Sequence, residues 1–286
     1  MTCFFVTDLH GKIDRYKKLF DKIEREKPSA VFLGGDLLPS GLQSLVSEDD
    51  LSDDFIEDII KKGFINLKNK LKEKYPRVFL ILGNDDGKAD EQTFIEIENE
   101  GLWEYVHSKK VEFEEFLIFG YSYVPPTPFL LKDWERYDVS RYVDPGCVPP
   151  TEGYHSITEK KDVWEYSTIK EDLQILTQNE DLSKAIFLFH SPPYKTKLDR
   201  AALDGIMIDH APLDVHVGSI AIERFIKTRQ PLITLHGHIH ESTSLTGSWH
   251  EKIGNTICIN GAHDGKELSL VKFDPTKPEN IRREIL

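Results

Sequence analysis

The sequence predicts an α/β fold built on a parallel β-sheet, and two features of its N-terminal part support that prediction. Short apolar runs at Cys3–Val6, Ala30–Leu33 and Val78–Leu82 are rich in Val, Ile and Phe and lead into Gly or Asp, as is typical of buried parallel strands. Between them, apolar residues recur at helical spacing over residues 13–23 and 55–71 on otherwise charged segments. A strand–helix–strand–helix–strand order predicts parallel strands joined by right-handed crossovers.

The same order of elements returns in the last third of the chain. The predicted elements there are a strand at Ala185–Phe189, a helix at Ile220–Lys227, and strands at Leu232–Leu235, Thr256–Ile259 and Leu268–Phe273. A turn around Asp264 and Gly265 is predicted to join the last two strands.

The middle of the chain, from about Tyr121 to Lys161, has little periodicity. It is rich in Pro, Tyr, Trp and charged residues, and it includes the proline-rich run Val124–Phe129. A stretch of this length without regular elements inside a domain is typical of a mobile or functional loop. We therefore expect a single domain over residues 1–286 that carries a proline-rich loop or lid at about 121–161.

The composition narrows the range of functions. With 36 basic and 49 acidic residues the formal charge is −13, which argues against a protein that grips long nucleic acid through its phosphates. No apolar run approaches the roughly 18 residues that a membrane-spanning helix needs, and Met1 leads into a strand rather than a basic leader. Cys3, Cys147 and Cys258 lack metal-type spacing and indicate reduced thiols, so a cytoplasmic location is expected.

Metal-type side chains follow five of the predicted strands. They are Asp8 and His10, Asp36, Asn84 and Asp85, His190, and His238 and His240. Each motif alone is weak evidence, because an Asp after a strand is often a turn former and a lone His is often structural. Ligands of α/β sheets collect beyond the carboxyl ends of the strands, and a pair of divalent cations would explain so many polar groups in one crevice.

The order of these motifs resembles that of the calcineurin-like metallophosphoesterases, in which D-x-H, G-D, G-N-H-[D/E], H and G-H-x-H follow one another. The matching residues run from Asp8 to His240 and cover nearly the whole chain. The segments His190–Tyr194, His216–Ser219 and Gly237–Glu241 further resemble the Icc-related predicted phosphoesterases of that superfamily. The resemblance implies a four-layer α-β-β-α sandwich, with two mixed sheets flanked by helices.

The resemblance also implies a dinuclear metal site. One metal would be held by Asp8, His10, Asp36 and His240, and the second by Asp36, Asn84, His190 and His238. Asp36 would bridge the two ions together with a hydroxide, which would attack phosphorus while the metals neutralise the phosphoryl oxygens. Nitrogen and oxygen ligands without thiolate suit Mn, Fe, Zn, Co or Ni, and the ligand set does not select among them.

The catalytic set that we expect is Asp36, Asn84, Asp85 and His190. Asp85 departs from the family pattern, because the resemblance implies a His at this position that contacts the phosphate and assists the leaving group. The sequence therefore leaves the source of leaving-group assistance open.

A candidate phosphate site precedes the predicted helix at Ile220–Lys227. His216, Gly218 and Ser219 lie there, and the free N–H groups and dipole at a helix start can bind a substrate phosphate. The alternative is that Ser219 only caps the helix.

The predicted function is hydrolysis of a small phosphodiester or phosphomonoester, with no membrane partner and no predicted oligomeric state. Two alternatives come from other classes. A catalytically silent binding scaffold with this fold should lack metal ligands, and all seven are present here. A nuclease acting on long DNA or RNA should carry a basic track, which the net charge disfavours.

Overall fold

The computed structural model of the chain describes residues 1–40, 54–158, 160–208 and 210–286, and its strands form two six-stranded sheets. The first sheet has the strand order β14 (Ile281–Ile285), β13 (Ser269–Phe273), β1 (Cys3–Val6), β2 (Ala30–Gly34), β3 (Arg77–Ile81) and β4 (Glu104–Tyr105). The second has the order β11 (His250–Ile253), β12 (Thr256–Asn260), β10 (Ile233–His236), β7 (Ala185–Phe189), β6 (Phe116–Tyr121) and β5 (Lys110–Phe113). A separate ribbon consists of β8 (Met207–Ile208) and β9 (Ala211–Pro212).

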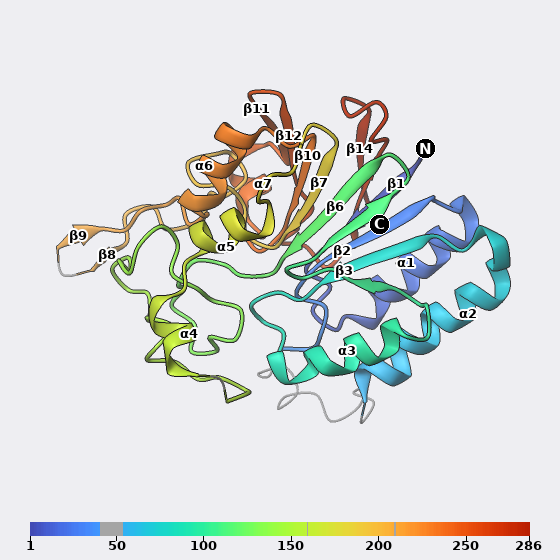
Figure 1. Ribbon diagram of the computed structural model, residues 1–286. Coiled ribbons are helices and arrows are strands. Elements are labelled where there is room, and N and C mark those ends of the chain that lie inside the picture. Colours follow the sequence, from blue (N-terminus) through green and yellow to red (C-terminus); the bar gives the residue numbers. More distant parts are fainter. Residues whose placement is uncertain (41–53, 159, 209) are drawn as a thin grey trace.

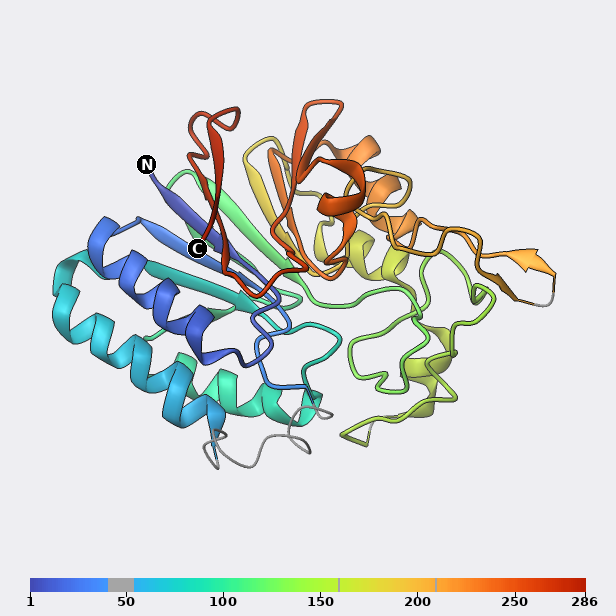
Figure 2. The ribbon, with the colours of Figure 1, turned by 180° about the vertical axis from the view of Figure 1, so that it is seen from behind.

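Helices cover the outer face of each sheet, so the molecule has four layers (Figure 1). The helical segments are α1 (Ile13–Glu26), the π-helical η1 (Ile56–Lys61) continuing into α2 (Lys62–Leu71), η2 (Lys72–Lys74), η3 (Lys88–Asp90), α3 (Glu91–Glu98), α4 (Lys161–Tyr166), α5 (Ile169–Leu176), α6 (Ile220–Arg229) and α7 (Ser242–Thr246). Helices α1, α2 and α3 flank the first sheet, and α5 and α6 flank the second, as the view from behind also shows (Figure 2). The four-layer α-β-β-α sandwich that the resemblance implied is confirmed.

The strands have apolar side chains on both faces, which divide between two cores. Phe5 and Phe32 lie between the sheets, together with residues of the second sheet such as Leu235. Phe4 faces the other way and packs with Tyr16 of α1. Because successive side chains of a strand point to opposite faces, strands covered on both sides are continuous apolar runs in the sequence. Burying each such side chain contributes about 1.5–3 kcal/mol.

The sequence predicted the parallel strands β1, β2, β3, β7, β10 and β12 within one or two residues at either end, but it did not predict the parallel strands β4 and β6. Strands β1, β2, β3 and β4 pair in parallel, and so do β12, β10, β7 and β6. The antiparallel edge strands β5, β11 and β14 were missed. Apart from the buried Phe113, their side chains are exposed or half-buried, and charged residues interrupt each strand, so they lack the apolar run that marks a central strand.

The predicted turn at Asp264 and Gly265 joins the two predicted strands Thr256–Ile259 and Leu268–Phe273, and these strands belong to different sheets. In the structure β12 pairs with β10 and β11, whereas β13 pairs with β1 and β14 in the other sheet. The turn therefore carries the chain from one sheet to the other. A turn signal predicts where a strand ends, but the partner of the next strand depends on tertiary packing.

The middle segment, residues 122–160 between β6 and α4, is irregular but well packed in its described part. Trp134 is fully buried, and the side chains of Lys132 and Glu135 form a buried ion pair at 2.6 Å. Glu135 also accepts the backbone N–H of Thr127 at 2.8 Å. Asp133 accepts the N–H of Lys88 at 2.7 Å, which fastens the segment to the loop after β3. Its role as a lid stays a prediction.

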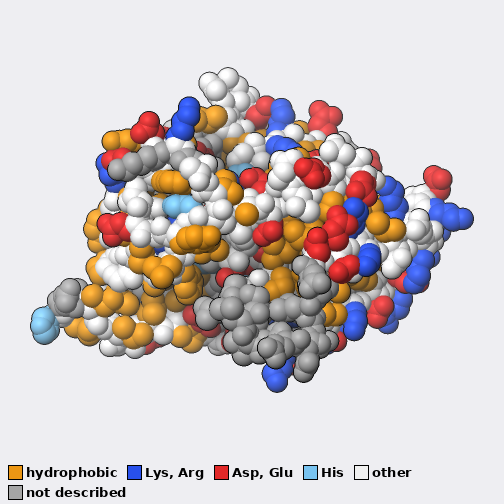
Figure 3. Space-filling view, turned by 90° about the horizontal axis from the view of Figure 1, so that it is seen from below, with side chains coloured by type: hydrophobic (Ala, Val, Ile, Leu, Met, Phe, Trp, Pro, Cys, Tyr) orange, Lys and Arg blue, Asp and Glu red, His pale blue; other side chains and the backbone are white. Residues whose placement is uncertain are grey.

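Exposed apolar side chains gather on one side of the molecule. Figure 3 shows them on the half of this face that carries the middle segment and the β8–β9 ribbon. The exposed large apolar side chains of these two segments include Phe129, Leu130, Tyr142, Tyr154 and Met207. Among the described residues, no helix is both long enough and apolar enough to cross a membrane.

Candidate metal centre

The predicted site residues come together where the two sheets adjoin. Strands β1, β2 and β3 of the first sheet run parallel, as do β7 and β10 of the second, and β2 and β3 contact β7 across the interface. The polar residues that follow these strands therefore converge from both sheets, as expected for the carboxyl ends of parallel strands.

The backbone at these strand ends adopts conformations that few side chains favour. Asp8, His10, Asp36 and His238 have φ values of 56°, 48°, 51° and 72°. The left-handed region is uncommon for non-glycine residues, and such strain persists where the surrounding structure enforces it. Here backbone hydrogen bonds join the loop after β1 to the loop after β2. The N–H of Asp8 donates to the carbonyl of Gly35 at 3.0 Å, and the N–H of His10 donates to the backbone carbonyl of Asp36 at 2.8 Å.

Glycine is required at one point of close approach. A Cβ atom on Gly83, directly before Asn84, would collide with Asp36 and lie 2.7 Å from Cε1 of His190. Only a residue without a side chain lets the loop after β3 pass this close to both groups.

The ligand-type atoms form two clusters that share one residue. The first contains Asp8, His10, Asp36 and His240, and the second contains Asp36, His190 and His238. Within each cluster the atoms lie within 4.8 Å of one another. The first cluster has the residues of the first expected ligand set, and the second has Asp36, His190 and His238 of the second set.

In the first cluster, the histidine nitrogens lie beside carboxylate oxygens and beside each other. Nδ1 of His10 donates to Oδ2 of Asp85 at 3.2 Å, which leaves the lone pair of Nε2 facing inward. That nitrogen lies 3.1 Å from Nε2 of His240, which in turn lies 3.2 Å from Oδ1 of Asp8. Oδ2 of Asp36 is 3.8 Å from Nε2 of His10.

The second cluster has the same character. Nδ1 of His190 must carry its proton, because it bonds the carbonyl of Gly34 at 2.8 Å and a carbonyl only accepts. In the neutral ring, Nε2 then presents a lone pair 3.1 Å from the amide oxygen of Asn84 and 3.2 Å from Oδ2 of Asp36. His238 lies beside it, with ring centroids 5.3 Å apart.

The residues therefore fit a pair of cations. Converging lone pairs and carboxylates repel one another unless a positive charge lies between them, and a buried polar group without a partner costs about 1–3 kcal/mol. The hydrogen bonds to Gly34 and Asp85 set the tautomers of His190 and His10 in the way that supports metal-ligating histidines.

Protons on the histidines can offset the negative charge of the carboxylates, and the pKa values differ among these histidines. Burial lowers the pKa of His190, but the carboxylates of Asp36 and Asp8 and the hydrogen bond to Gly34 together raise it to about 9. Burial opposes protonation of His10 too, yet its bond to Asp85 and the charge of Asp36 raise the pKa to about 9. For His238 burial dominates, and the pKa falls to about 3.

Asp85 has a partner that the sequence did not indicate. Its side chain accepts from His10, and its backbone N–H donates to Oδ1 of Asp36 at 2.8 Å. Since Asp85 stands in the loop after β3 and His10 in the loop after β1, only the folded chain brings them together.

Two supporting residues were missed by sequence reasoning. Asp86 is fully buried and accepts the N–H groups of Leu37, Leu38 and Gly83, which joins the loops carrying Asp36 and Asn84. The adjacent Asp85-Asp86 pair after a strand was the available signal. Arg15 of α1 donates to the backbone carbonyl of Asp8, and its position on an amphipathic helix gave no such signal.

The candidate phosphate residues already have protein partners. Ser219 caps α6 by accepting the N–H of Ile222 at 3.0 Å, as the alternative predicted. Asp138 accepts the N–H groups of Ile220 and Ala221, so a carboxylate already lies at this helix start. The N–H of Gly218 donates to Asp199 at 3.2 Å. Phosphate binding by His216, Gly218 and Ser219 remains a prediction.

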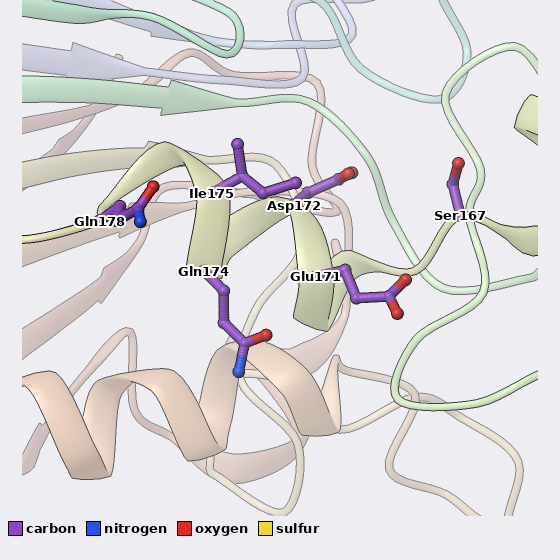
Figure 4. A pocket seen from close by; sticks show the side chains of 6 residues that line it. All are labelled: Ser167, Glu171, Asp172, Gln174, Ile175 and Gln178. Atoms are coloured by element: carbon purple, nitrogen blue, oxygen red, sulfur yellow. The ribbon is translucent and has the colours of Figure 1, made fainter.

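A surface hollow of about 610 Å³ lies elsewhere, on the exposed side of α5. Its lining residues are Ser167, Glu171, Asp172, Gln174, Ile175 and Gln178, whose side chains point in several directions (Figure 4). None of them belongs to either cluster, so this hollow has no part in the metal centre.

A protein-family profile matches the sequence over most of its length. Residues 1–242 match the profile described as calcineurin-like phosphoesterase. The chain belongs to the calcineurin-like phosphoesterase family. No curated protein matches this family member.

Solved structures support the fold of this calcineurin-like phosphoesterase. One crystal structure has a TM-score of 0.60 at 17% identity and covers 99% of this chain and 98% of its own. The protein TT1561 of Thermus thermophilus has a TM-score of 0.55 at 16% identity, covering 99% and 98% respectively. At these identities the likeness shows the shared architecture.

Proposed function

We propose that this phosphoesterase hydrolyses small phosphate esters with two divalent transition-metal ions. The proposed ligands are Asp8, His10, Asp36 and His240 for the first ion, and Asp36, Asn84, His190 and His238 for the second. The observation that carries the proposal is the convergence of inward-facing histidine lone pairs on Asp36, which belongs to both clusters. Mn, Fe, Zn, Co and Ni all suit such a set of nitrogen and oxygen ligands.

When bound, the cations would supply Lewis acidity and a water of lowered pKa near neutral pH. The chain's own groups do the positioning. Gly34 and Asp85 fix the tautomers of His190 and His10, and the N–H of Asp85 holds the carboxylate of Asp36 in place. These contacts reduce the reorganisation required when substrate binds.

A small diester or monoester is the proposed substrate class. The net charge of −13 disfavours long nucleic acid, which argues against the nuclease alternative. A silent scaffold is disfavoured because all seven candidate ligands are present and converge, whereas loss of catalysis removes the selection that retains them. We also propose a single domain and a cytoplasmic location, the latter supported by three free cysteines.

The test is a substrate panel with metal-reconstituted protein. Aryl phosphomonoesters, aryl phosphodiesters and cyclic nucleotides should be hydrolysed only after a transition metal is added. Two metals per chain should be measured by elemental analysis. Failure to bind metal, or a rate that does not depend on it, would overturn the proposal.

A further inference from the structure

A second constellation lies outside the two metal clusters. Asp199 is fully buried, and its carboxylate accepts the N–H groups of Lys195 and Thr196, each at 3.0 Å. It also bonds Nδ1 of His216 at 2.8 Å. A buried carboxylate with this many donors is firmly held, and it in turn fixes the orientation of the His216 ring.

The pairing sets the tautomer of His216. A carboxylate accepts, so Nδ1 carries the proton and Nε2 is the nitrogen left for another partner. In the described part of the chain Nε2 has no hydrogen-bond partner, and 27% of the surface of the His216 side chain is exposed. The ring is therefore oriented by protein on one side and accessible on the other.

Hydrogen bonds connect the segments around His216 and Asp199 to two of the turns that carry candidate metal ligands. On one side, Ser219 donates its N–H to Pro192, two residues after His190, at 2.9 Å. On the other side, Arg200 pairs with His216 in an antiparallel bridge, and Ala202 donates its N–H to Glu241 at 3.2 Å. Glu241 directly follows His240. The segments bearing His216 and Asp199 thus adjoin the turns that carry a ligand of each cluster.

We propose that His216, oriented by Asp199, is the acid that protonates the leaving group. The inference rests on the proposed hydrolase function. Asp85 is poorly suited to this task, because its side chain already accepts a hydrogen bond from His10. His216 supplies the leaving-group assistance that the departure at position 85 left unassigned.

His216 enters the step with a proton on each ring nitrogen. A water loses a proton to solvent and its oxygen forms a bond to phosphorus, while the bond between phosphorus and the ester oxygen breaks. The ester oxygen keeps the electron pair and takes the proton from Nε2 of His216. The ring leaves the step neutral, with Nδ1–H still bonded to Asp199, and regains a proton from solvent.

The inference predicts a dependence on the leaving group. General acid catalysis is typically worth about 10²–10⁴-fold, and the benefit is greatest when the departing oxygen is strongly basic. His216→Gln should therefore slow hydrolysis of alkyl esters by about 10²–10⁴-fold. Nitrophenyl esters, whose leaving group needs no proton, should change by only a few-fold. Asp199→Asn should give the same pattern with a smaller loss.

The experiment compares wild-type protein, His216→Gln and Asp199→Asn over a series of diesters with increasingly basic leaving groups. His250→Gln, at an exposed position on β11, is the matched control and should follow the wild type. Metal content should stay unchanged in all variants. Equal losses across the series, or loss of metal, would overturn the inference while leaving the hydrolase function intact.

A second readout needs no activity. In the metal-free protein, the long-range proton–nitrogen NMR spectrum should show His216 as the Nδ1–H tautomer, assigned by its absence in His216→Gln. Asp199→Asn should produce a tautomer mixture. An Nε2–H tautomer in the wild type would contradict the role. Absence of hydrolysis of every ester by metal-loaded wild type would overturn the proposed function and this inference together.

Discussion

The metal centre and the middle segment both bury charged groups in irregular parts of the chain. They differ in whether the protein itself supplies partners for those charges. In the middle segment, Lys132 pairs with Glu135 and donates to the carbonyl of Thr127, so each charge has a protein partner. In the metal centre, Nε2 of His190 faces only oxygen acceptors. A buried charge with a full set of partners supports structure, whereas converging acceptors indicate a ligand that brings positive charge.

The two regions also differ in the backbone conformations of their residues. Four residues of the metal centre have φ values between 48° and 72°. In residues 122–158 and 160 the positive φ value belongs to Gly146, which bears such a conformation without strain. The centre stores strain where function is proposed, and the middle segment is relaxed. Variants of the two regions should therefore separate loss of metal from loss of stability.

The largest effect should come from Asp36→Asn. The amide keeps an oxygen that can accept the N–H of Asp85, but it removes the charge shared by both clusters. Metal occupancy should fall at both positions and hydrolysis should be abolished, measured by elemental analysis and turnover. His238→Ala should instead lower occupancy mainly at the second position. Full activity in both variants would show that the two clusters do not hold the metals.

The reverse pattern is expected for Lys132→Ala. Removing one partner of a buried ion pair costs about 3–5 kcal/mol, so the free energy of unfolding in urea should fall by that amount. Metal content of the folded protein should not change. Lys252→Ala breaks an exposed pair with Glu279 and should cost at most about 1 kcal/mol. Parallel loss of metal in Lys132→Ala would show that the two regions are not separable.

A smaller effect is expected at the partner of a ligand. Asp85→Asn weakens the charged acceptor that orients His10, and such outer partners are typically worth about 10–100-fold in metal affinity. Titration with a competing chelator measures the change. Asp181→Asn, at a fully exposed carboxylate, is the control and should leave affinity unchanged. Unaltered affinity in Asp85→Asn would mean that His10 is oriented without this bond.

The smallest expected effect is the change of metal affinity with each unit of pH. His10 and His190 have pKa values raised to about 9, so below that pH the metal-free protein holds protons that a metal must displace. Affinity should rise as pH rises toward about 9, by up to about tenfold per pH unit for each proton displaced. Calorimetry in buffers of different ionisation enthalpy counts the protons released. Affinity that is independent of pH would contradict the proton-loaded centre.

Sequence reasoning succeeded where the signal is local. A strand such as β7 is a continuous apolar run because both of its faces are covered, and His190 follows it directly. Parallel strands of one sheet end at the same edge, which predicts that Asp8 and Asp36 meet. His190 follows a strand of the other sheet, and its place beside them was implied by the family resemblance. The edge strands carried no such signal, because a half-exposed charged strand is hard to distinguish from a surface loop.

Only the tertiary structure decided which groups pair within the site. Asp85 meets His10 across 75 positions of sequence, and Asp199 meets His216 across 17. These bonds set tautomers, and a tautomer determines whether a histidine nitrogen offers a lone pair or a proton. Side-chain hydrogen bonds between loops follow no sequence period, because they depend on how close two sheets bring their ends. The sequence therefore determined the elements and the composition of the metal centre, and the packing of the two sheets determined the orientation of each group within it.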